Sequence, residues 1–331
     1  MNSPKLSIVV ICWNDADCIL DCIASVCREA GQLSFEVIVS DNGSTDNSVS
    51  VIRQHYPDVR IIENGRNLGF GAGNNAGFRA ARGEYVLILN PDTILQSGCL
   101  EKLVCYADAH PEGGAFGCRV LNPDGSLQFT AQPTPTVGGY LVAALYLRWL
   151  GRISPSFLSD KYIGWDGSSD RDIGFQAACC LLVRRELLQE LGGFDETIPH
   201  QFEDADLCYR IWKRGKKVMF THQPEITHIG GRNRGGYPID VVLDTERSKC
   251  RFFQKHYGPG GVARIRWVSL ISLAIRYCGY SLLRTVKPGQ QYQARIQEYR
   301  TLLQWYWRLG LREFQDAGAA QPTPTIVKLP N

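Results

Sequence analysis

Hydrophobic and polar positions along the first hundred residues predict short strands separated by helices. Apolar, β-branched runs of this length are typical of strands that are buried on both faces. The runs are residues 5–12, 35–40, 59–62 and 85–89. Between the first two runs, apolar residues recur at helical spacing from Ile19 to Val26, and Asp17 is expected to cap that helix. The alternation predicts an α/β fold with a mixed, mainly parallel sheet flanked by helices.

The pattern becomes less regular after Leu100. Residues 119–140 contain Asn-Pro-Asp-Gly and further proline turns, which indicate a hairpin followed by a loop. Residues 162–172 predict a long loop, and the apolar segment at 175–183 leads into a helix that ends at Gly192. Another helix is expected to begin at Glu203, and a short strand follows at residues 218–220.

The C-terminal part has a different character. Residues 262–283 are mostly apolar but include three arginines, which makes the segment a poor membrane-spanning helix. An interfacial helix fits better, with Trp267, Tyr277 and Tyr280 near the lipid head groups. The alternative is an ordinary helix packed on the core. From Ala317 onward the chain is rich in Ala, Gly, Pro and Thr, and we expect it to be disordered.

Composition and charge place the chain among ordinary globular proteins. Its 331 residues are 44% hydrophobic and 21% charged, and a net charge of +3 is too small to favour nucleic acid as the main partner. The twelve cysteines show no paired C-x-x-C spacing, which argues against zinc. Met1 leads almost directly into the first strand, so we expect no signal peptide, free thiols and a cytoplasmic location.

Two carboxylates follow buried strands, where ligands of open α/β sheets bind. Asp41 ends the second strand, and it either meets a nucleoside or bonds its own backbone in a turn. Asp92 ends Asn90-Pro91-Asp92 after the fourth strand. A departing nucleoside diphosphate needs a divalent cation, and oxygen ligands such as Asp92 suit Mg²⁺ or Mn²⁺. By itself, Asn-Pro-Asp is also a common turn.

A glycine-rich run spans residues 67–77. Its glycines allow the backbone to approach a ligand, or they pack the start of a helix against the sheet. The run contains Gly71-x-Gly73 but no complete dinucleotide fingerprint, which argues against NAD. Further along, Arg232 follows a glycine pair and is a candidate diphosphate clamp, with a solvated loop as the equal alternative.

Acidic residues cluster at the start of one predicted helix. Glu203, Asp204 and Asp206 suit the positive end of a helix dipole, but three carboxylates in one turn also repel one another and raise each other's pKa. A raised pKa suits a general base. His228 follows the next strand, and a single histidine of this kind is more often structural than a metal ligand.

Taken together, these motifs resemble family 2 glycosyltransferases, in particular the rhamnosyltransferase-like branch of bacterial surface polysaccharide assembly. The resemblance covers roughly residues 5–235, and its specificity comes from seven weak motifs in the correct order. They are Ser7-Ile8-Val9-Val10, Asp41-Asn42-Gly43-Ser44-Thr45-Asp46, Asn67-x-Gly69-Phe70, Asn74-Asn75-x-Gly77, Leu89-Asn90-Pro91-Asp92, Gly193-Phe194-Asp195 and Glu203-Asp204-x-Asp206-Leu207.

The resemblance implies a GT-A fold and an inverting, metal-dependent transfer from a nucleotide-sugar. It implies that Asp204 is the general base with Glu203 beside it, and that Asp92 and His228 bind Mn²⁺ or Mg²⁺. The donor-binding positions it implies are Asp41, Asn67, Gly69, Asn74, Asn75, Asn90 and Asp92. Arg232, the candidate diphosphate clamp named above, is added to them. Two positions depart from the family pattern: Asn90 replaces a common aspartate, and residues 175–178 replace a Ser-Gly-Ala-like stretch on the acceptor side.

We therefore expect a nucleotide-sugar transferase domain over residues 1–235, with a nucleotide-binding half at 1–100 and an acceptor or catalytic half at 101–235. A helical, membrane-associated extension over 236–316 and a disordered tail over 317–331 complete the expected layout. The expected partners are a nucleotide-sugar, a glycan or lipid-linked acceptor and the inner face of the cytoplasmic membrane. The alternatives are a nucleotidyltransferase, whose basic glycine-rich signature is missing near the first strand, and a non-catalytic nucleotide-sugar-binding protein.

Overall fold

The computed structural model describes residues 3–152, 162, 164–230, 237–287 and 289–309. The chain divides into two compact units. The first contains the described residues up to Thr134 together with residues 164–230, and it holds the sheet. The second begins at Pro135 and resumes at Tyr237. Residues 135–152 thus group with the C-terminal helices, whereas the sequence assigned them to the transferase domain.

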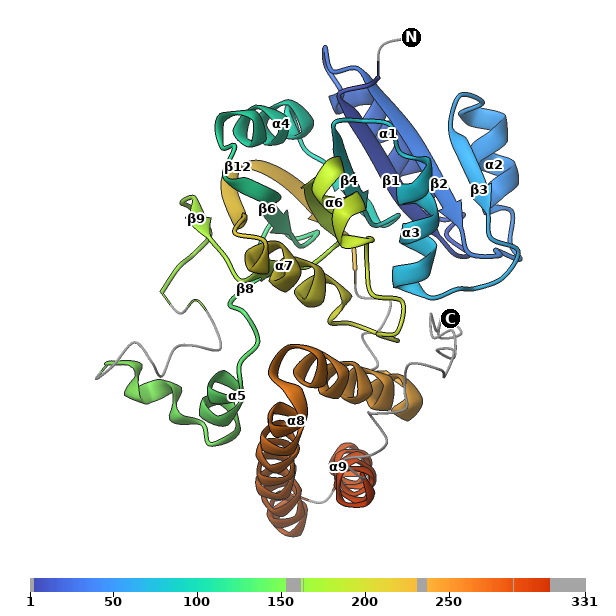
Figure 1. Ribbon diagram of the computed structural model, residues 1–331. Helices are drawn as coiled ribbons and strands as arrows, with labels where there is room; N and C mark the ends of the chain where they lie inside the picture. Colours follow the sequence, from blue (N-terminus) through green and yellow to red (C-terminus); the bar gives the residue numbers. More distant parts are fainter. Residues whose placement is uncertain (1–2, 153–161, 163, 231–236, 288, 310–331) are drawn as a thin grey trace. The chain divides into compact units, whose positions relative to one another are not determined.

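The N-terminal half of the sheet is parallel, as predicted (Figure 1). Its strands run in the order β3-β2-β1-β4, and the apolar residues of β1 and β4 are buried on both faces. The bounds are Leu6–Cys12 for β1, Phe35–Asp41 for β2, Arg60–Glu63 for β3 and Tyr85–Leu89 for β4. Because these strands are parallel, their carboxyl ends share one edge of the sheet.

The rest of the sheet is mixed and continues from β4 in the order β11-β6-β12-β5. Here β11 is antiparallel to β4 and β6, β12 is parallel to β6, and β5 is antiparallel to β12. The bounds are Cys180–Arg184 for β11, Gly113–Leu121 for β6, Lys217–His228 for β12 and Thr93–Leu95 for β5. Short strands add β7 (Leu127–Gln128) beside β6, β9 (Arg171–Asp172) beside β12, and the pair β8 (Ala131–Gln132) and β10 (Phe175–Gln176).

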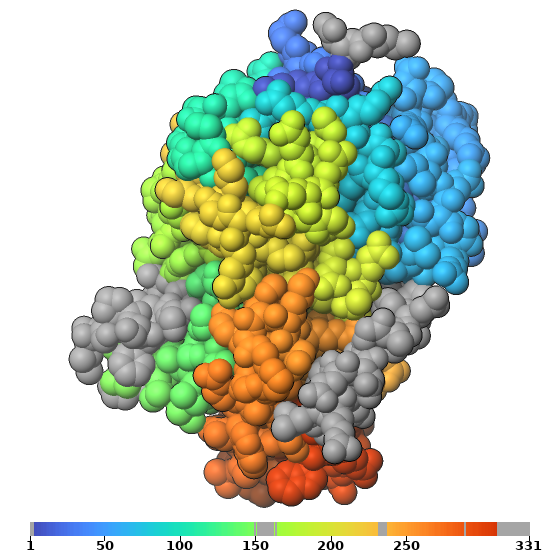
Figure 2. Space-filling model, in the orientation of Figure 1, coloured from blue at the N-terminus to red at the C-terminus, as the bar shows by residue number. Residues whose placement is uncertain are grey.

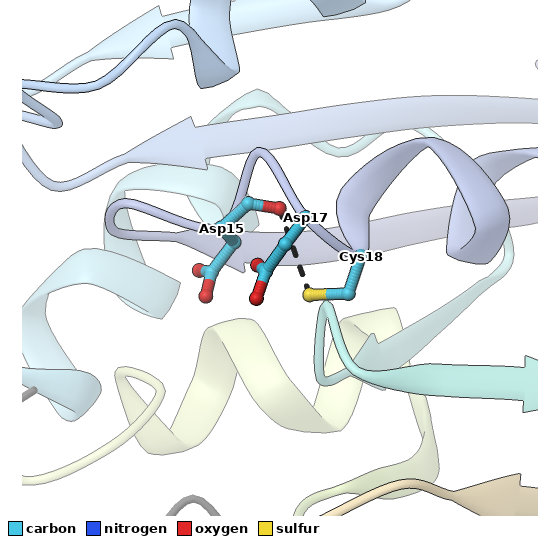
Figure 3. A group of neighbouring side chains, drawn as sticks. All are labelled: Asp15, Asp17 and Cys18. Carbon is cyan, nitrogen blue, oxygen red and sulfur yellow. Dashed lines mark hydrogen bonds between the residues drawn. The ribbon is translucent and has the colours of Figure 1, made fainter. Parts of the chain in front are cut away.

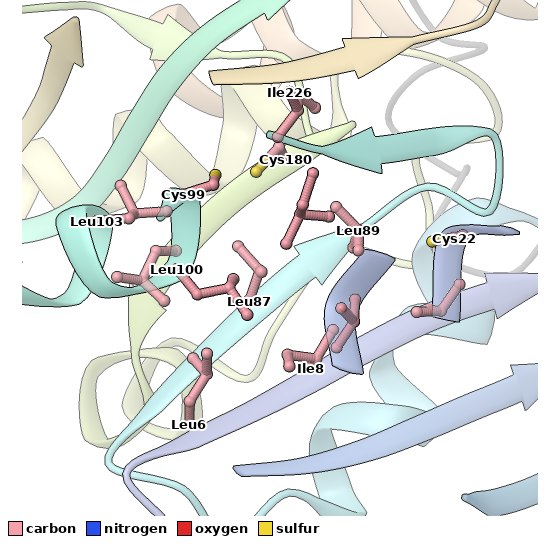
Figure 4. Close-up of a cluster of buried hydrophobic side chains, with 14 of the residues drawn as sticks. Leu6, Ile8, Cys22, Leu87, Leu89, Cys99, Leu100, Leu103, Cys180 and Ile226 are labelled. Atoms are coloured by element: carbon pink, nitrogen blue, oxygen red, sulfur yellow. The ribbon is translucent and has the colours of Figure 1, made fainter. Parts of the chain in front are cut away.

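One face of the sheet is covered by α1 (Ile19–Glu29) and α4 (Cys99–Ala109). Their apolar stripes pack on alternate residues of β1 and β4, where burial of side chains such as Ile8 and Leu87 supplies most of the stabilising free energy (Figure 4). The shorter α2 (Ser48–His55) packs against α1. The predicted hairpin is present as β6, a turn and β7.

The other face carries α3 (Phe70–Ala80), which needs glycine where it contacts the sheet. A Cβ on Gly77 would lie 2.3 Å from Val9 Cγ1, and one on Gly73 would lie 2.7 Å from Ile11 Cδ1. These glycines therefore allow close packing of helix on sheet, which was the alternative to ligand approach. In Figure 2 the surface of α3 adjoins that of α6 (Arg185–Leu191) and the residues that follow it.

In the first unit, α4, β5 and most of β6 were not predicted, and the short strands β8 and β9 lie where the sequence indicated loops. β12 is also longer than the predicted strand at residues 218–220, because it resumes after an irregularity between Phe220 and Glu225 and runs to His228. Helix α1 begins one residue later than expected, with Cys18 rather than Asp17 at the N-cap position.

The second unit consists of helices. These are α5 (Val137–Ala144), a 3₁₀ turn at Leu147–Arg152, α8 (Ile239–Val286) and α9 (Gln290–Arg308). Helix α8 bends at Gly258, whose φ of 67° is left-handed, next to Pro259, and Figure 1 shows its two arms. α9 packs along α8 through Tyr280, Tyr292 and Tyr299, so Tyr280 contacts protein where the sequence placed it near lipid head groups.

Within the described residues, each helix is too short or too polar to cross a lipid bilayer. The predicted disordered tail, 317–331, lies outside the described residues.

Candidate active site

Asp92 and His228 meet at the carboxyl edge of the sheet. Asp92 follows β4 in a tight turn, and β5 begins at the next residue. The antiparallel pairing of β5 with β12 places His228 opposite Thr93, and the Ile229 N–H donates to the Asp92 carbonyl at 2.8 Å. As a result, His228 Nε2 lies 3.2 Å from Asp92 Oδ1, and each side chain is 17% exposed.

Asp204 is linked to the turn that carries Asp92 through residues 178–179. It occupies the first turn of α7 (Glu203–Lys213), is half-buried, and its Oδ2 accepts the Ala178 N–H at 3.3 Å. The next residue, Cys179, accepts the Asn90 N–H at 3.0 Å through its carbonyl. Burial raises the pKa of the Cys179 thiol, and the charges of Cys180, Asp92 and Asp204 raise it further. Both carboxylates therefore lie close enough to Cys179 for their charges to act on its thiol.

Glu203 and Asp204, at the start of α7, differ in their protonation state near pH 7. Burial raises the pKa of Asp204 to about 6, against backbone hydrogen bonds from Ala205 and Ala178 that lower it. Burial, followed by the charge of Asp204, raises the pKa of Glu203 to about 8. Near pH 7 Asp204 is mainly a carboxylate, able to accept a proton, while Glu203 is mainly protonated.

The cause of these raised pKa values differs from the cause that we expected from the sequence. Mutual repulsion of three carboxylates was expected, but burial is the leading cause at both Glu203 and Asp204. Asp206 instead forms an ion pair with Arg210, with Oδ2 accepting from Nε at 2.7 Å, and its side chain is fully buried. Its charge is therefore balanced within the helix.

The segment that departs from the family pattern, residues 175–178, has two structural roles. Gln176 is fully buried, and its Nε2 donates to the Cys118 carbonyl at 3.2 Å and to Thr130 Oγ1 at 2.9 Å. Ala178 supplies the N–H that holds the Asp204 carboxylate. This backbone contact was not visible in the sequence, because any residue other than proline offers the same donor.

Asp41 makes the local turn that was weighed against nucleoside binding. Its Oδ2 accepts from the Gly43 N–H at 3.0 Å and from the Ser44 N–H at 3.2 Å, and the residue is 3% exposed. Asn67 likewise closes a turn, since its Oδ1 accepts the Gly69 N–H at 2.9 Å. Gly69 has a left-handed φ of 83°, which glycine adopts without strain. Donor binding by these residues stays a prediction.

Asn74 and Asn75 are buried in α3, where hydrogen bonds within the protein hold them. Asn75 Oδ1 accepts from the Phe194 N–H at 2.8 Å, and its Nδ2 donates to the Phe194 carbonyl at 2.9 Å. Asn74 Nδ2 donates to the Phe70 carbonyl at 3.0 Å. The Gly193-Phe194-Asp195 motif is thus joined to α3, and a role of either amide in donor binding stays a prediction. Arg232 lies outside the described residues.

A different group of metal-ligand side chains lies after β1. Ligand atoms of Asp15, Asp17 and Cys18 are within 4.8 Å of one another (Figure 3). Cys18 Sγ donates to the Asp15 carbonyl at 3.6 Å, and Asp15 Oδ2 accepts the Trp13 N–H at 2.8 Å. A thiol is a poor ligand for Mg²⁺ or Mn²⁺, and Asp17 is exposed, so we assign no metal to this group.

Comparison with known proteins supports the class that this geometry suggests. The family described as Glycosyl transferase family 2 matches residues 7–192. The N-acetylglucosaminyl-diphospho-decaprenol L-rhamnosyltransferase of Mycobacterium tuberculosis (strain H37Rv) is 30% identical over 260 residues, covering 75% of this chain and 83% of the relative. The chain belongs to glycosyl transferase family 2. It is a glycosyltransferase, and within the family it is similar to rhamnosyltransferases.

Further relatives agree with this assignment. The O-antigen biosynthesis protein RfbC of Myxococcus xanthus is 28% identical, covering 70% of this chain and 18% of that protein. A mannosyltransferase from Pyrobaculum calidifontis, solved with GDP-Man and Mn²⁺, has a TM-score of 0.54 at 17% identity, over 92% of this chain and 88% of that one. GalNAc-T7, solved with UDP, GalNAc and Mn²⁺, has a TM-score of 0.54 at 17% identity, over 76% of this chain and 50% of that one. The fold is therefore GT-A, as predicted.

Proposed function

We propose that this glycosyltransferase moves rhamnose or a similar hexose, with inversion, from a nucleoside-diphosphate donor to a glycan or lipid-linked acceptor in cell-surface polysaccharide synthesis. The main support is that Asp92 contacts His228 at the sheet edge, and that residues 178–179 link the turn of Asp92 to Asp204. The M. tuberculosis relative is named for rhamnosyl transfer to a lipid-diphosphate sugar, and RfbC for O-antigen biosynthesis.

Asp204 is the proposed general base. Its carboxylate takes the proton of the acceptor hydroxyl, whose oxygen attacks the anomeric carbon while the bond from that carbon to the diphosphate breaks. The nucleoside diphosphate leaves with the bonding electron pair, and the sugar is inverted. General-base assistance of this kind contributes about 10²–10⁴-fold to the rate. The Ala178 N–H and the turn of α7 hold the carboxylate in place.

The residues at the diphosphate end fit a divalent cation. Imidazole nitrogen and carboxylate oxygen both bind Mn²⁺, and Nε2 of His228 and Oδ1 of Asp92 face each other at 3.2 Å. A cation held there would supply positive charge against the departing diphosphate. Asn90 in place of an aspartate leaves one negative charge fewer at this edge, so diphosphate oxygens and water would complete the coordination.

We also propose that the protein acts at the inner face of the cytoplasmic membrane, where a lipid-linked acceptor would be presented. Its composition and free cysteines suit a cytoplasmic protein. The part of the chain that would contact lipid is argued below.

Incubation of the purified chain with a panel of nucleotide-sugars and Mn²⁺ tests the function. A bound donor raises the melting temperature by mass action, and the matching donor should be hydrolysed slowly without acceptor and transferred with one. NMR of the product should show the anomeric configuration opposite to that of the donor. The proposal would be refuted if the chain neither bound nor turned over any nucleotide-sugar. A product that keeps the anomeric configuration of the donor would refute the single displacement.

A further inference from the structure

One face of the second arm of α8 is exposed and apolar along its length. Its residues recur every three or four positions, which places them on one side of the helix. They are Trp267, Ile271, Ile275, Cys278, Leu282 and Val286, which we call the α8 stripe. Trp267 is 58% exposed, Leu282 68% and Val286 71%. Contiguous apolar surface of this kind marks an interaction site.

The stripe is not the face of α8 that packs against α9. Ile265 and Leu270 point to the interior of the second unit and are buried. Tyr280 contacts Tyr299 of α9, with ring centroids 5.5 Å apart. The second arm of α8 therefore has one face that packs against α9 and another that is apolar and exposed.

The charges on the arm that carries the stripe are of one sign. Residues 259–287 contain four arginines, one lysine and no aspartate or glutamate. Arg264, one turn before Trp267 on the same face, is exposed, as are Arg276, Arg284 and Lys287. A helix with its side chains is about 10–12 Å across, close to one Debye length in physiological salt, so all these charges act on whatever covers the stripe.

A second tryptophan extends the surface. Arg266 Nε donates to the Tyr306 carbonyl at 2.8 Å, and its Nη2 donates to the Trp307 carbonyl at 2.9 Å. These bonds join the last turn of α9 to the turn of α8 that carries Trp267. Trp307 is 71% exposed. Tryptophan is enriched at membrane–water interfaces, because its ring is apolar and its N–H is polar.

We propose that the α8 stripe binds an anionic lipid bilayer, with its apolar side chains among the head groups and the basic residues facing the negative surface. A second copy of the chain would bring two strongly basic helices together, which like-charge repulsion disfavours. Each basic residue near an anionic surface strengthens binding to it. The inference rests on the proposed membrane location but not on the proposed reaction, because α8 belongs to the second unit and the catalytic residues to the first.

Vesicle flotation with the full chain tests this. We expect binding to vesicles of phosphatidylcholine mixed with phosphatidylglycerol, and much weaker binding to phosphatidylcholine alone. Replacing Ile271 and Ile275 with asparagine should lower the partition coefficient about tenfold, because exposed apolar area available for burial is lost. Ile239→Asn is the matched control, since Ile239 lies on the same helix with 37% exposure but outside the stripe, and it should bind like the native protein.

Three results would overturn the proposal. The native chain could stay in the aqueous fraction with anionic vesicles, or the double variant could float as well as the native chain. Sedimentation could instead show a dimer that the double variant dissociates, which would assign the stripe to a second copy. Transfer to a water-soluble acceptor should survive in the double variant, which shows that the fold is intact.

A second and independent observation concerns the residue behind His228. Gln128 on β7 accepts from the imidazole, with 2.8 Å between Oε1 and His228 Nδ1. Gln128 Nε2 donates in turn to Asn122 Oδ1 at 3.3 Å, and Asn122 Nδ2 donates to Ser126 Oγ at 3.0 Å. The hydrogen bond to Asn122 therefore orients the amide of Gln128 so that its oxygen faces the imidazole.

This contact requires a proton on Nδ1, because Oε1 of Gln128 can only accept. In the neutral imidazole the lone pair is therefore on Nε2, which lies 3.2 Å from Asp92 Oδ1. Two acceptor atoms 3.2 Å apart suit a shared cation. We infer that Gln128 is a positioning residue that holds His228 ready to bind the divalent cation, an inference that rests on the proposed function. Partners of this kind typically contribute 10–100-fold to metal affinity.

Calorimetric titration with Mn²⁺ alone tests the role of Gln128. Gln128→Leu should raise the Kd for Mn²⁺ about 10–100-fold, and Gln128→Glu, which keeps the acceptor oxygen, should restore it. Gln132→Leu is the matched control, an exposed glutamine on the neighbouring β8 that should leave the Kd unchanged. NMR of the ring nitrogens should show the Nδ1–H tautomer in the native protein and a mixture in Gln128→Leu.

The outcomes separate this inference from the reaction. If the native chain binds Mn²⁺ and Gln128→Leu binds it equally well, the role of Gln128 is refuted while the metal site stands. If the native chain does not bind Mn²⁺ with or without nucleoside diphosphate, the metal site is refuted and the inference fails with it.

Discussion

Nε2 of His228 lies 3.2 Å from Oδ1 of Asp92, although the strands that end beside them, β12 and β4, are not neighbours in the sheet. Asp92 is placed by the end of β4, and His228 by the antiparallel pairing of β12 with β5. The pair therefore depends on a three-residue strand at the edge of the sheet.

Removal of either member of the pair should weaken donor binding that depends on metal. Asp92→Ala and His228→Ala should each weaken Mn²⁺-dependent binding of the nucleoside diphosphate by more than the roughly 10–100-fold typical of groups that only orient a ligand. His222→Ala is the control, because His222 lies on the same strand but pairs with Asp170. Calorimetry with Mn²⁺ and nucleoside diphosphate measures this, and an unchanged affinity would remove the pair from the metal site.

Asp204→Asn should abolish transfer without loss of donor binding. The amide cannot take the acceptor proton, so kcat should fall about 10²–10⁴-fold. Asp58→Asn, at an exposed turn, serves as the control and should be fully active. Single-turnover kinetics with the matching donor separates the chemical step from binding. Normal turnover by Asp204→Asn would show that another group is the base.

The rate should rise with pH through the pKa of Asp204. Burial raises that pKa to about 6, and only the carboxylate form accepts a proton. We therefore expect kcat/KM to be low at about pH 5, to rise through an inflection near 6 and to level off above it. A profile that is flat between about pH 5 and pH 8 would contradict this assignment.

Glu203 should make the protein less stable as pH rises. Its pKa is raised from 4.5 to about 8 in the folded protein, so between these values the folded state holds a proton that the unfolded state has lost. The free energy of unfolding therefore falls as pH increases across this window. Glu203→Gln cannot ionise, and it should be more stable than the native chain at about pH 8, by on the order of a few kcal/mol. Chemical denaturation at several pH values measures the difference, which should vanish near pH 4.

Gly77→Ala should destabilise the sheet domain. The added Cβ would lie 2.3 Å from Val9 Cγ1, so α3 must move away from β1 at a cost of about 1–3 kcal/mol. Gly138→Ala is the control, because a Cβ there meets no atom within 4 Å and alanine is the better helix former. Thermal unfolding should show a lower Tm for the first variant and an equal or higher Tm for the second.

The sequence by itself determined the strands of the parallel half and the helix ends marked by glycine. The apolar run at residues 5–12 matches β1 (Leu6–Cys12) to within one residue, because a continuous apolar, β-branched run is what a strand buried on both faces requires. Gly192 ends α6 with a left-handed φ of 74°, which few other residues tolerate. The ordered motifs also predicted the family, since they combine backbone constraints with chemistry.

The tertiary structure alone decided which polar groups meet and in what state. Asp92 and His228 are joined by β5, whose three residues are too short to show any periodicity, and β12 reaches His228 only across an irregularity. Asn75 serves to hold Phe194, and the pKa of Glu203 is raised first by burial and only second by the charge of Asp204. Local patterns encode the backbone of each segment, whereas contacts and burial depend on distant segments packing together. For that reason the sequence predicted the candidate residues, and only the fold shows how they are held and charged.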